Sequence, residues 1–157
     1  MSIEAVRTYL QTFGLDDRII EFSQSSATVE QAAQANHCDP ARIAKTLSFL
    51  LEDRCILIVA AGDAKIDNGK YKARFGHKAK MVAFDDVEER VGHAAGGVCP
   101  FAVKDNVDVY LDESLKRFDI VFPAAGNSSS AVRLTPAELE KASASNGWVD
   151  VCKGWNN

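Results

Sequence analysis

Three short segments carry groups that could do chemistry, and the first contains Lys45, which lies where a predicted helix gives way to a strand. A lysine at such a junction can be partly desolvated, and its ammonium group could then hold a carbonyl oxygen or stabilise an oxyanion. Thr46 adds a hydroxyl that could orient a water molecule. Because most lysines lie on the solvated surface, residue type alone leaves both interpretations open.

The second segment is a glycine-rich loop over residues 92–101 (GHAAGGVCPF). The pair Gly96 and Gly97 lets backbone N–H groups approach a ligand closely, and Pro100 stiffens the end of the loop. His93 could be a general base, although a lone histidine in such a loop is weak support. The loop could line a small-substrate site, or it could simply connect a helix to a strand.

The third segment is residues 124–130 (AAGNSSS), whose small and polar side chains could form a pocket floor or a hairpin turn. Asp112 follows a predicted strand and is interpreted as a cap for the next turn. The sequence contains no nucleophile elbow, phosphate-binding loop or zinc-protease motif. Any catalytic site would therefore be formed by the three segments described above.

Helical periodicity and N-capping side chains predict helices over residues 2–13, 28–36, 39–45, 67–76 and 85–92, and another from residue 135. Runs rich in β-branched and aromatic residues predict strands over residues 18–23, 46–51, 55–61, 80–84, 107–111, 120–123, 131–134 and 148–152. The apolar run 55–61 is typical of a central strand buried on both faces. Short strands interleaved with short helices predict an α+β fold with a mixed sheet, formed by one domain over residues 1–157.

Composition is that of an ordinary soluble globular protein, with 46% hydrophobic and 25% charged residues in a chain of 157. No apolar run approaches the roughly 20 residues that span a bilayer, and the first residues lack signal-peptide features. We therefore expect a cytoplasmic location and no membrane partner.

The four cysteines form no C-x-x-C pair, and no second ligand pair accompanies the adjacent His37 and Cys38. We therefore expect free thiols and no metal.

Charge is unevenly distributed along the chain. Residues 64–80 carry a net charge of +5, whereas the remainder carries −9 and the whole chain −4. A local basic face on an acidic protein could contact phosphates, or it could be the solvated face of one helix. The candidate phosphate-binding residues are Lys65, Lys70, Lys72 and Arg74.

Six segments, in this order, resemble the YbaK/EbsC family, which is related to the editing insertion of bacterial prolyl-tRNA synthetases. The similarity extends over roughly residues 20–140. The matching segments are residues 28–33 (TVEQAA), 42–47 (RIAKTL), 58–63 (IVAAGD), 92–101 (GHAAGGVCPF), 109–112 (VYLD) and 124–126 (AAG).

That resemblance implies a mixed, barrel-like β-sheet flanked by helices and removal of a noncognate amino acid from tRNA, usually tRNA(Pro). The family lysine falls on Lys45 and the family's G-x-x-x-P loop falls on Gly96 to Pro100. The ammonium of Lys45 and the N–H groups of Gly96 and Gly97 would be the oxyanion donors. The substrate would be bound by Phe22, Ser25, Ser26, Thr46, Pro100, Gly126, Asn127 and Ser128.

The leading hypothesis is a trans-acting deacylase that removes Cys, Ala, Ser or Thr from mischarged tRNA, without a cofactor and with no role on DNA. A prolyl-tRNA synthetase is a candidate partner. Water, a ribose hydroxyl or a substrate thiol could attack the ester, and the sequence does not choose among them. The main alternative is a noncatalytic tRNA- or synthetase-binding module of the same fold, and a thiol-redox protein is a third reading.

Overall fold

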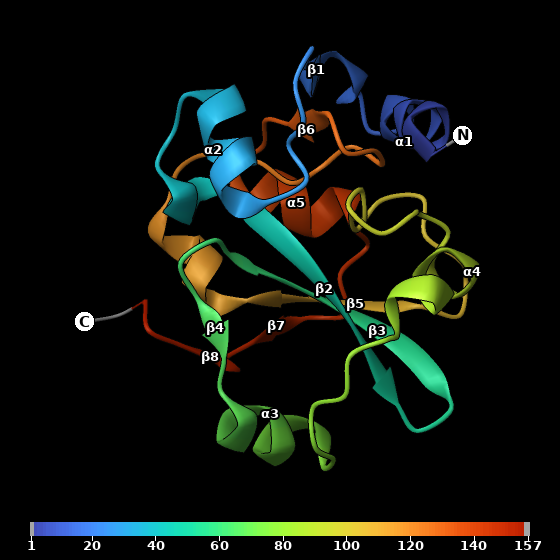
Figure 1. Ribbon diagram of the computed structural model, residues 1–157, viewed down its shortest axis with the longest axis vertical. Coiled ribbons are helices and arrows are strands. Elements are labelled where there is room, and N and C mark those ends of the chain that lie inside the picture. The colour runs from blue at the N-terminus through green and yellow to red at the C-terminus, as the bar shows by residue number, and fades with distance from the viewer. Residues whose placement is uncertain (1, 156–157) are drawn as a thin grey trace.

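The computed structural model describes residues 2–155 (Figure 1). Its helices are α1 (Ser2–Gln11), α2 (Val29–Asn36), α3 (Asn68–Phe75), α4 (Val87–Val91) and α5 (Pro136–Ala142), with short 3-10 turns η1 (Asp16–Arg18), η2 (Pro40–Arg42), η3 (Phe84–Asp86) and η4 (Glu113–Arg117). Its strands are β1 (Ile19–Glu21), β2 (Ala44–Leu51), β3 (Arg54–Ala61), β4 (Lys65–Ile66), β5 (Asp108–Asp112), β6 (Ser130–Val132), β7 (Trp148–Val149) and β8 (Cys152–Lys153). None of the helices in this part of the chain is both long and apolar enough to cross a membrane.

The central sheet has four strands in the order β2-β3-β5-β7. Strands β2 and β3 pair antiparallel, whereas β3 with β5 and β5 with β7 pair in parallel. Two small antiparallel pairs, β1 with β6 and β4 with β8, complete the strand pairing. The mixed α+β fold expected from the sequence is confirmed, with β2 at one edge of the central sheet.

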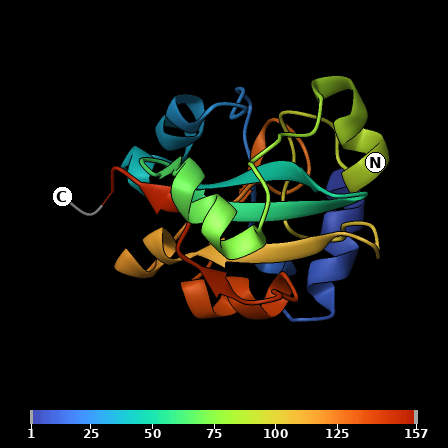
Figure 2. The same ribbon diagram turned by 90° about the horizontal axis from the view of Figure 1, so that it is seen from below.

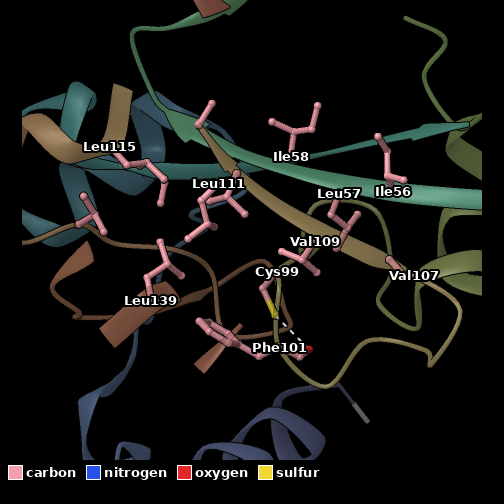
Figure 3. Close-up of a cluster of buried hydrophobic side chains, with 14 of the residues drawn as sticks. Ile56, Leu57, Ile58, Cys99, Phe101, Val107, Val109, Leu111, Leu115 and Leu139 are labelled. Atoms are coloured by element: carbon pink, nitrogen blue, oxygen red, sulfur yellow. Dashed lines mark hydrogen bonds between the residues drawn. The ribbon is translucent and has the colours of Figure 1, made fainter. Parts of the chain in front are cut away.

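The two faces of this sheet are covered by different elements. Figure 1 shows α3 below the strands, with α1, α2 and α5 above them, and in the view from below α3 lies in front (Figure 2). On the α3 face, the rings of Phe49 and Tyr71 pack at 5.2 Å. On the other face, Leu57 and Val109 point toward Phe101 (Figure 3). Strand β3 is buried along nearly its whole length, as its apolar sequence predicted.

Local capping chemistry determines where several helices begin and end. Thr28 forms a capping box with Gln31 at the start of α2, where the sequence predicted a helix from residue 28. Asp67 caps α3 through the Lys70 N–H, and Gly76 ends that helix in a left-handed conformation with φ 79°. These signals are local in sequence, so they could be identified without knowledge of the tertiary structure.

Some expectations about elements near the edge of β2 were wrong. The helix predicted to reach Lys45 ends at Arg42 as the 3-10 turn η2, so Lys45 is the second residue of a strand. The strand predicted over residues 80–84 is reduced to one isolated bridge at Met81, and the one over 120–123 to bridges at residues 121 and 122. Asp85 lies inside η3 and does not cap a helix. These segments touch a neighbouring strand for one or two residues and then diverge, which propensity alone cannot reveal.

Candidate active site

A cavity of about 490 Å³ lies along the outer edge of β2. Its other walls come from the start of α2, from η3, from the glycine-rich loop and from the segment before and within β6. The lining residues are Ser26, Ala27, Thr28, Val29, Ala32, Ile43, Ala44, Lys45, Thr46, Leu47, Ser48, Met81, Val82, Phe84, Val87, Ala95, Gly96, Val98, Phe122, Ala124, Ser130 and Ala131. Most of these are small or apolar, and none carries a carboxylate.

Lys45 lines this cavity and is half-buried. Its ammonium group donates hydrogen bonds to the carbonyl oxygens of Gly62, at 3.4 Å, and of Ala64. Burial lowers the pKa of the Lys45 ammonium from its ordinary value, although the negative charge of Asp63 opposes that shift. An ammonium has three N–H donors, so these two carbonyls leave one donor for a ligand.

The edge of β2 is covered by other backbone on both sides of Thr46, but not at Thr46 itself. Upstream, the Ala44 N–H donates to the Phe122 carbonyl at 3.1 Å. Downstream, the Ser48 carbonyl accepts from the Val82 N–H at 3.0 Å. Because backbone groups of alternate residues point to the same side of a strand, the N–H and C=O of Thr46 also point away from β3. Neither group has a partner among residues 2–155, and the buried Thr46 hydroxyl is likewise unpaired.

The glycine-rich loop lies against the segment that precedes β6. A β-carbon built on Gly97 would lie 2.6 Å from the Asn127 Cα, and one on Gly96 would lie 3.9 Å from the Ser128 side chain. Gly97 donates its N–H to the Ala94 carbonyl at 3.0 Å, so that group is already engaged in a turn. Gly96, at φ 91°, lines the cavity. In this structure Gly97 therefore allows the close packing of two loops, and Gly96 is the glycine that a ligand can reach.

Beneath this loop lies a buried histidine that does not line the cavity. His93 is 1% exposed, and its Nε2 donates to the Phe101 carbonyl at 2.7 Å. Burial lowers the pKa of His93, although the bond to Phe101 opposes that shift. Its Nδ1 has no partner among the described residues. His93 therefore holds the far end of the loop, where it cannot reach a ligand in the cavity as a general base.

The residues expected to contact the substrate fall into two groups. Ser26 and Thr46 line the cavity together with Lys45 and Gly96. The others lie outside its lining: Phe22, Ser25, Pro100, Gly126, Asn127 and Ser128. Some of this second group join the walls to each other, because the N–H of Ser26 donates to the Ser128 carbonyl at 2.7 Å and that of Phe22 to the Ser129 carbonyl at 2.8 Å.

Two exposed apolar side chains at the cavity were not identified from the sequence. Met81 is 57% exposed and Phe84 is 77% exposed, and they are the large hydrophobic residues on the surface of the described chain. Both line the cavity. The sequence placed them in a predicted strand, and only the folded chain shows that they stand at this site. An exposed aromatic ring beside a cavity is a suitable platform for a flat ligand.

The basic side chains near α3 differ in whether another group of the protein already binds them. Lys70 pairs with Asp150 at 3.0 Å and also donates to the Cys152 carbonyl. The guanidinium of Arg74 lies over the Tyr110 ring at 5.4 Å. Lys65 and Lys72 are exposed, and no ion pair is found for them within residues 2–155. Asp112, interpreted as a cap, does accept from the Ser114 N–H and additionally from the Val151 N–H.

The cysteines have the environment of inert thiols. All four are free, and three of them are buried. Burial raises the pKa of the Cys99 and Cys152 thiols to about 12 and also raises that of Cys55 and Cys38. Reactive thiols need the opposite shift, which disfavours a redox role. Among the described residues no group of His, Cys, Asp and Glu could hold a metal ion.

Comparison with known proteins gives this arrangement a context. The profile of the aminoacyl-tRNA editing domain matches residues 23–142, which include β2, the glycine-rich loop and the cavity. The chain belongs to this editing-domain family. The resemblance inferred from the sequence segments is thereby confirmed.

Relatives of this editing domain range from near full-length matches to small parts of larger enzymes. A Bacillus subtilis protein, YwhH, described as uncharacterized, is 53% identical over 156 residues and 99% of both chains. EbsC of Enterococcus faecalis, described as a candidate Cys-tRNA(Pro)/Cys-tRNA(Cys) deacylase, is 26% identical over 75% of this chain and 73% of its own. The proline–tRNA ligase of Bacillus velezensis is 22% identical over 57% of this chain, which corresponds to 16% of the ligase.

Among solved structures, one described as a candidate trans-editing enzyme for prolyl tRNA synthetase superposes on this editing domain with a TM-score of 0.87. Its sequence is 30% identical, and the match covers 98% of each chain. A hypothetical protein, APE2540, has a TM-score of 0.85 at 25% identity over 95% of this chain and 99% of its own. The editing-domain fold is therefore shared along nearly the whole chain.

Proposed function

We propose that this protein is a trans-acting deacylase that hydrolyses the ester of a small noncognate amino acid on mischarged tRNA. The observation that carries this proposal is that one cavity of about 490 Å³ is lined by both Lys45 and Gly96 in a chain of the editing-domain family. We propose tRNA(Pro) as the tRNA, because one structural neighbour is described as editing for prolyl tRNA synthetase. The protein would act in the cytoplasm, where charged tRNA is found.

The composition of the cavity suits a small acyl group. Alanine, valine, serine and threonine form most of its walls, so a small side chain meets apolar and hydroxyl groups of its own size. A synthetase pocket distinguishes side chains that differ by one methylene by only about 1–3 kcal/mol, and a second sieve is needed to remove the errors. Cysteine, alanine, serine and threonine are the candidate residues, and cysteine is supported by the described activity of EbsC.

The chemistry needs little beyond positioning and charge stabilisation, because an aminoacyl ester is already activated. A nucleophile adds to the ester carbonyl carbon, the bond to the ribose oxygen breaks, and that oxygen takes a proton. The remaining N–H of Lys45 is a donor for the developing oxyanion, and the Gly96 N–H, which has no partner within residues 2–155, is a second. Water as the nucleophile releases the free amino acid directly. A substrate thiol would release it as a cyclic thioester that water then opens, and the neighbouring ribose hydroxyl would take over the acyl group, which water must still remove.

The surface around the cavity offers contacts for the end of a tRNA. The exposed ring of Phe84 can stack against the terminal base, because stacking on an aromatic side chain is the usual way to bind an unpaired base. Lys65 on β4 and Lys72 on α3 are candidates for phosphate contacts, together with Lys70 and Arg74. The four acidic residues over 85–89 make the Phe84 side of the rim unfavourable for phosphates. A prolyl-tRNA synthetase is the proposed protein partner.

The principal alternative is a noncatalytic module of the same fold that binds tRNA or a synthetase. A deacylation panel separates the two functions. The wild-type protein and Lys45→Ala are incubated with tRNA(Pro), tRNA(Ala) and tRNA(Ser), each charged with Cys, Ala, Ser or Thr, and release of the amino acid is measured. We expect the wild type to release at least one of these amino acids much faster than Lys45→Ala. Equal release by both proteins, with normal tRNA binding, would favour the binding module.

A further inference from the structure

A charged amino group must be accommodated in a cavity that has no negatively charged wall. An aminoacyl ester carries an α-ammonium group beside the carbonyl carbon that is attacked. None of the lining residues is aspartate or glutamate. The partners available for the ammonium are therefore neutral acceptors, and backbone carbonyl groups are strong ones.

The open position in the edge of β2 supplies such an acceptor next to a donor. Other backbone contacts the edge on both sides of it, because Phe122 accepts from the Ala44 N–H and Val82 donates to the Ser48 carbonyl. At Thr46 alone, the C=O and the N–H both face the cavity without a partner within residues 2–155. The two groups lie at the spacing with which one residue of an antiparallel strand exchanges two hydrogen bonds with its opposite residue.

We propose that Thr46 binds the amino-acid part of the substrate through its backbone, as if that amino acid were one residue of an added strand. The C=O of Thr46 accepts from the α-ammonium group, and the N–H of Thr46 donates to the ester carbonyl oxygen. This proposal rests on the proposed deacylase function and names how its substrate is positioned. It makes Thr46 a backbone binding residue whose side-chain identity is secondary.

The arrangement also gives the substrate side chain a defined direction. Residues directly opposite each other in an antiparallel pair place their side chains on the same face. The substrate side chain would then lie on the Thr46 face of β2, beside Ala44 and Ser48, which are both buried and small. Lys45 lies on the other face of the strand and reaches the substrate at its carbonyl end. The backbone of Thr46 would thus bind the main-chain groups of the substrate amino acid, whereas the small residues on the Thr46 face of β2 would select its side chain by size.

The test removes the Thr46 N–H while the rest of the site is kept. Proline lacks this N–H and is tolerated at edge positions whose N–H does not enter the sheet, so Thr46→Pro is compared with Thr46→Val, which keeps the N–H. A second comparison is needed in case the proline variant misfolds. Here Thr46→Val is compared with the same protein in which the α-hydroxy acid of valine is incorporated at position 46 by in vitro translation, so that an ester oxygen replaces the N–H. Circular dichroism and melting temperature report the fold of each protein.

We expect both N–H-deficient proteins to have a kcat/KM for alanyl-tRNA(Pro) about tenfold or more below that of Thr46→Val. One lost hydrogen bond should lower kcat/KM about tenfold. If the correctly folded ester variant has a kcat/KM within about twofold of that of Thr46→Val, the proposal is overturned. The ammonium contact is tested with lactyl-tRNA(Pro), prepared by deamination, which we expect the wild type to hydrolyse about tenfold more slowly. Equal rates on the two substrates would reject that contact. A wild type inactive on every mischarged tRNA would instead reject the deacylase function itself.

Discussion

The backbones of Gly97 and Asn127 are in direct contact, and this contact joins the two loops that form one end of the cavity. A β-carbon on Gly97 would lie within 2.9 Å of three Asn127 backbone atoms. Backbone cannot move aside as a flexible side chain can, so even a methyl group must separate the loops. The position of Gly96 at the cavity depends on this contact.

Gly97→Ala should therefore separate the loops and destabilise the protein. Overpacking of this kind lowers the free energy of unfolding by about 1–3 kcal/mol, which chemical denaturation can measure. Gly69→Ala is the matched control, because its β-carbon would meet only the Asp67 side chain, at 3.3 Å, inside a helix. Equal stability of the two variants would contradict the tight contact at Gly97.

Loss of the Lys45 ammonium should reduce catalysis much more than binding. If it stabilises the oxyanion, Lys45→Ala should lower kcat by about 10²–10³-fold. The lowered pKa of Lys45 also predicts that wild-type activity falls at an alkaline pH below the ordinary lysine value of about 10.4, as the ammonium loses its proton. Lys45→Arg should shift this fall to higher pH, because arginine stays protonated. An unchanged pH profile in Lys45→Arg would contradict the assignment.

His93 should make the protein less stable in mild acid. Its folded-state pKa is lowered by burial, so below its ordinary pKa of about 6.5 the unfolded chain binds a proton that the folded chain does not. Stability contributed by neutral His93 is complete above that pH and is lost as the pH falls toward the folded-state value. The slope from this one group is at most about 1.4 kcal/mol per pH unit. His93→Gln should flatten the profile of unfolding free energy between pH 7 and 5, and an unchanged profile would assign the slope to other groups.

Phe84 should affect tRNA affinity and leave stability unchanged, because its ring is 77% exposed. Base stacking on an aromatic side chain contributes about 1–3 kcal/mol, so Phe84→Ala should raise the KM for mischarged tRNA about thirtyfold, at the middle of that range. Phe84→Tyr keeps the ring and serves as the control. Equal KM values for the Ala variant and the wild type would exclude stacking at this position.

The basic residues should contribute unequally to tRNA binding. Lys65 and Lys72 are free of ion pairs within the described chain, whereas Lys70 already pairs with Asp150. Lys65→Glu and Lys72→Glu should therefore weaken tRNA binding and make its salt dependence shallower, and Lys70→Glu should do so less. Lys141→Glu, on α5 at the opposite face of the sheet, is the control for charge alone. Unchanged binding in the first two variants would reject the basic surface as a phosphate contact.

The elements that could be predicted from the sequence are those whose signal is local. The capping boxes at Thr28 and Thr135 involve residues three positions apart, and the apolar run of β3 marks a buried strand by composition. Lys45 and the glycine-rich loop were singled out as separate pieces, and the family resemblance placed them in one site. Most errors lie along the edge of β2, where Met81 bridges Phe49 and Phe122 bridges Ile43, while the adjacent Val121 bridges Leu134. Each partner lies more than ten residues away in the sequence.

The sequence by itself determined the mixed α+β class, most capping residues and the membership of the editing-domain family. Only the tertiary structure decided that Thr46 lies unpaired between the points where Phe122 and Val82 contact the strand edge, and that Phe84 stands exposed at the same cavity. The physical reason is that a capping signal is contained in one turn of chain, whereas the state of a strand edge depends on which distant segments reach it. Residues 80–82 and 122 both reach β2, and the gap that they leave is the candidate binding site.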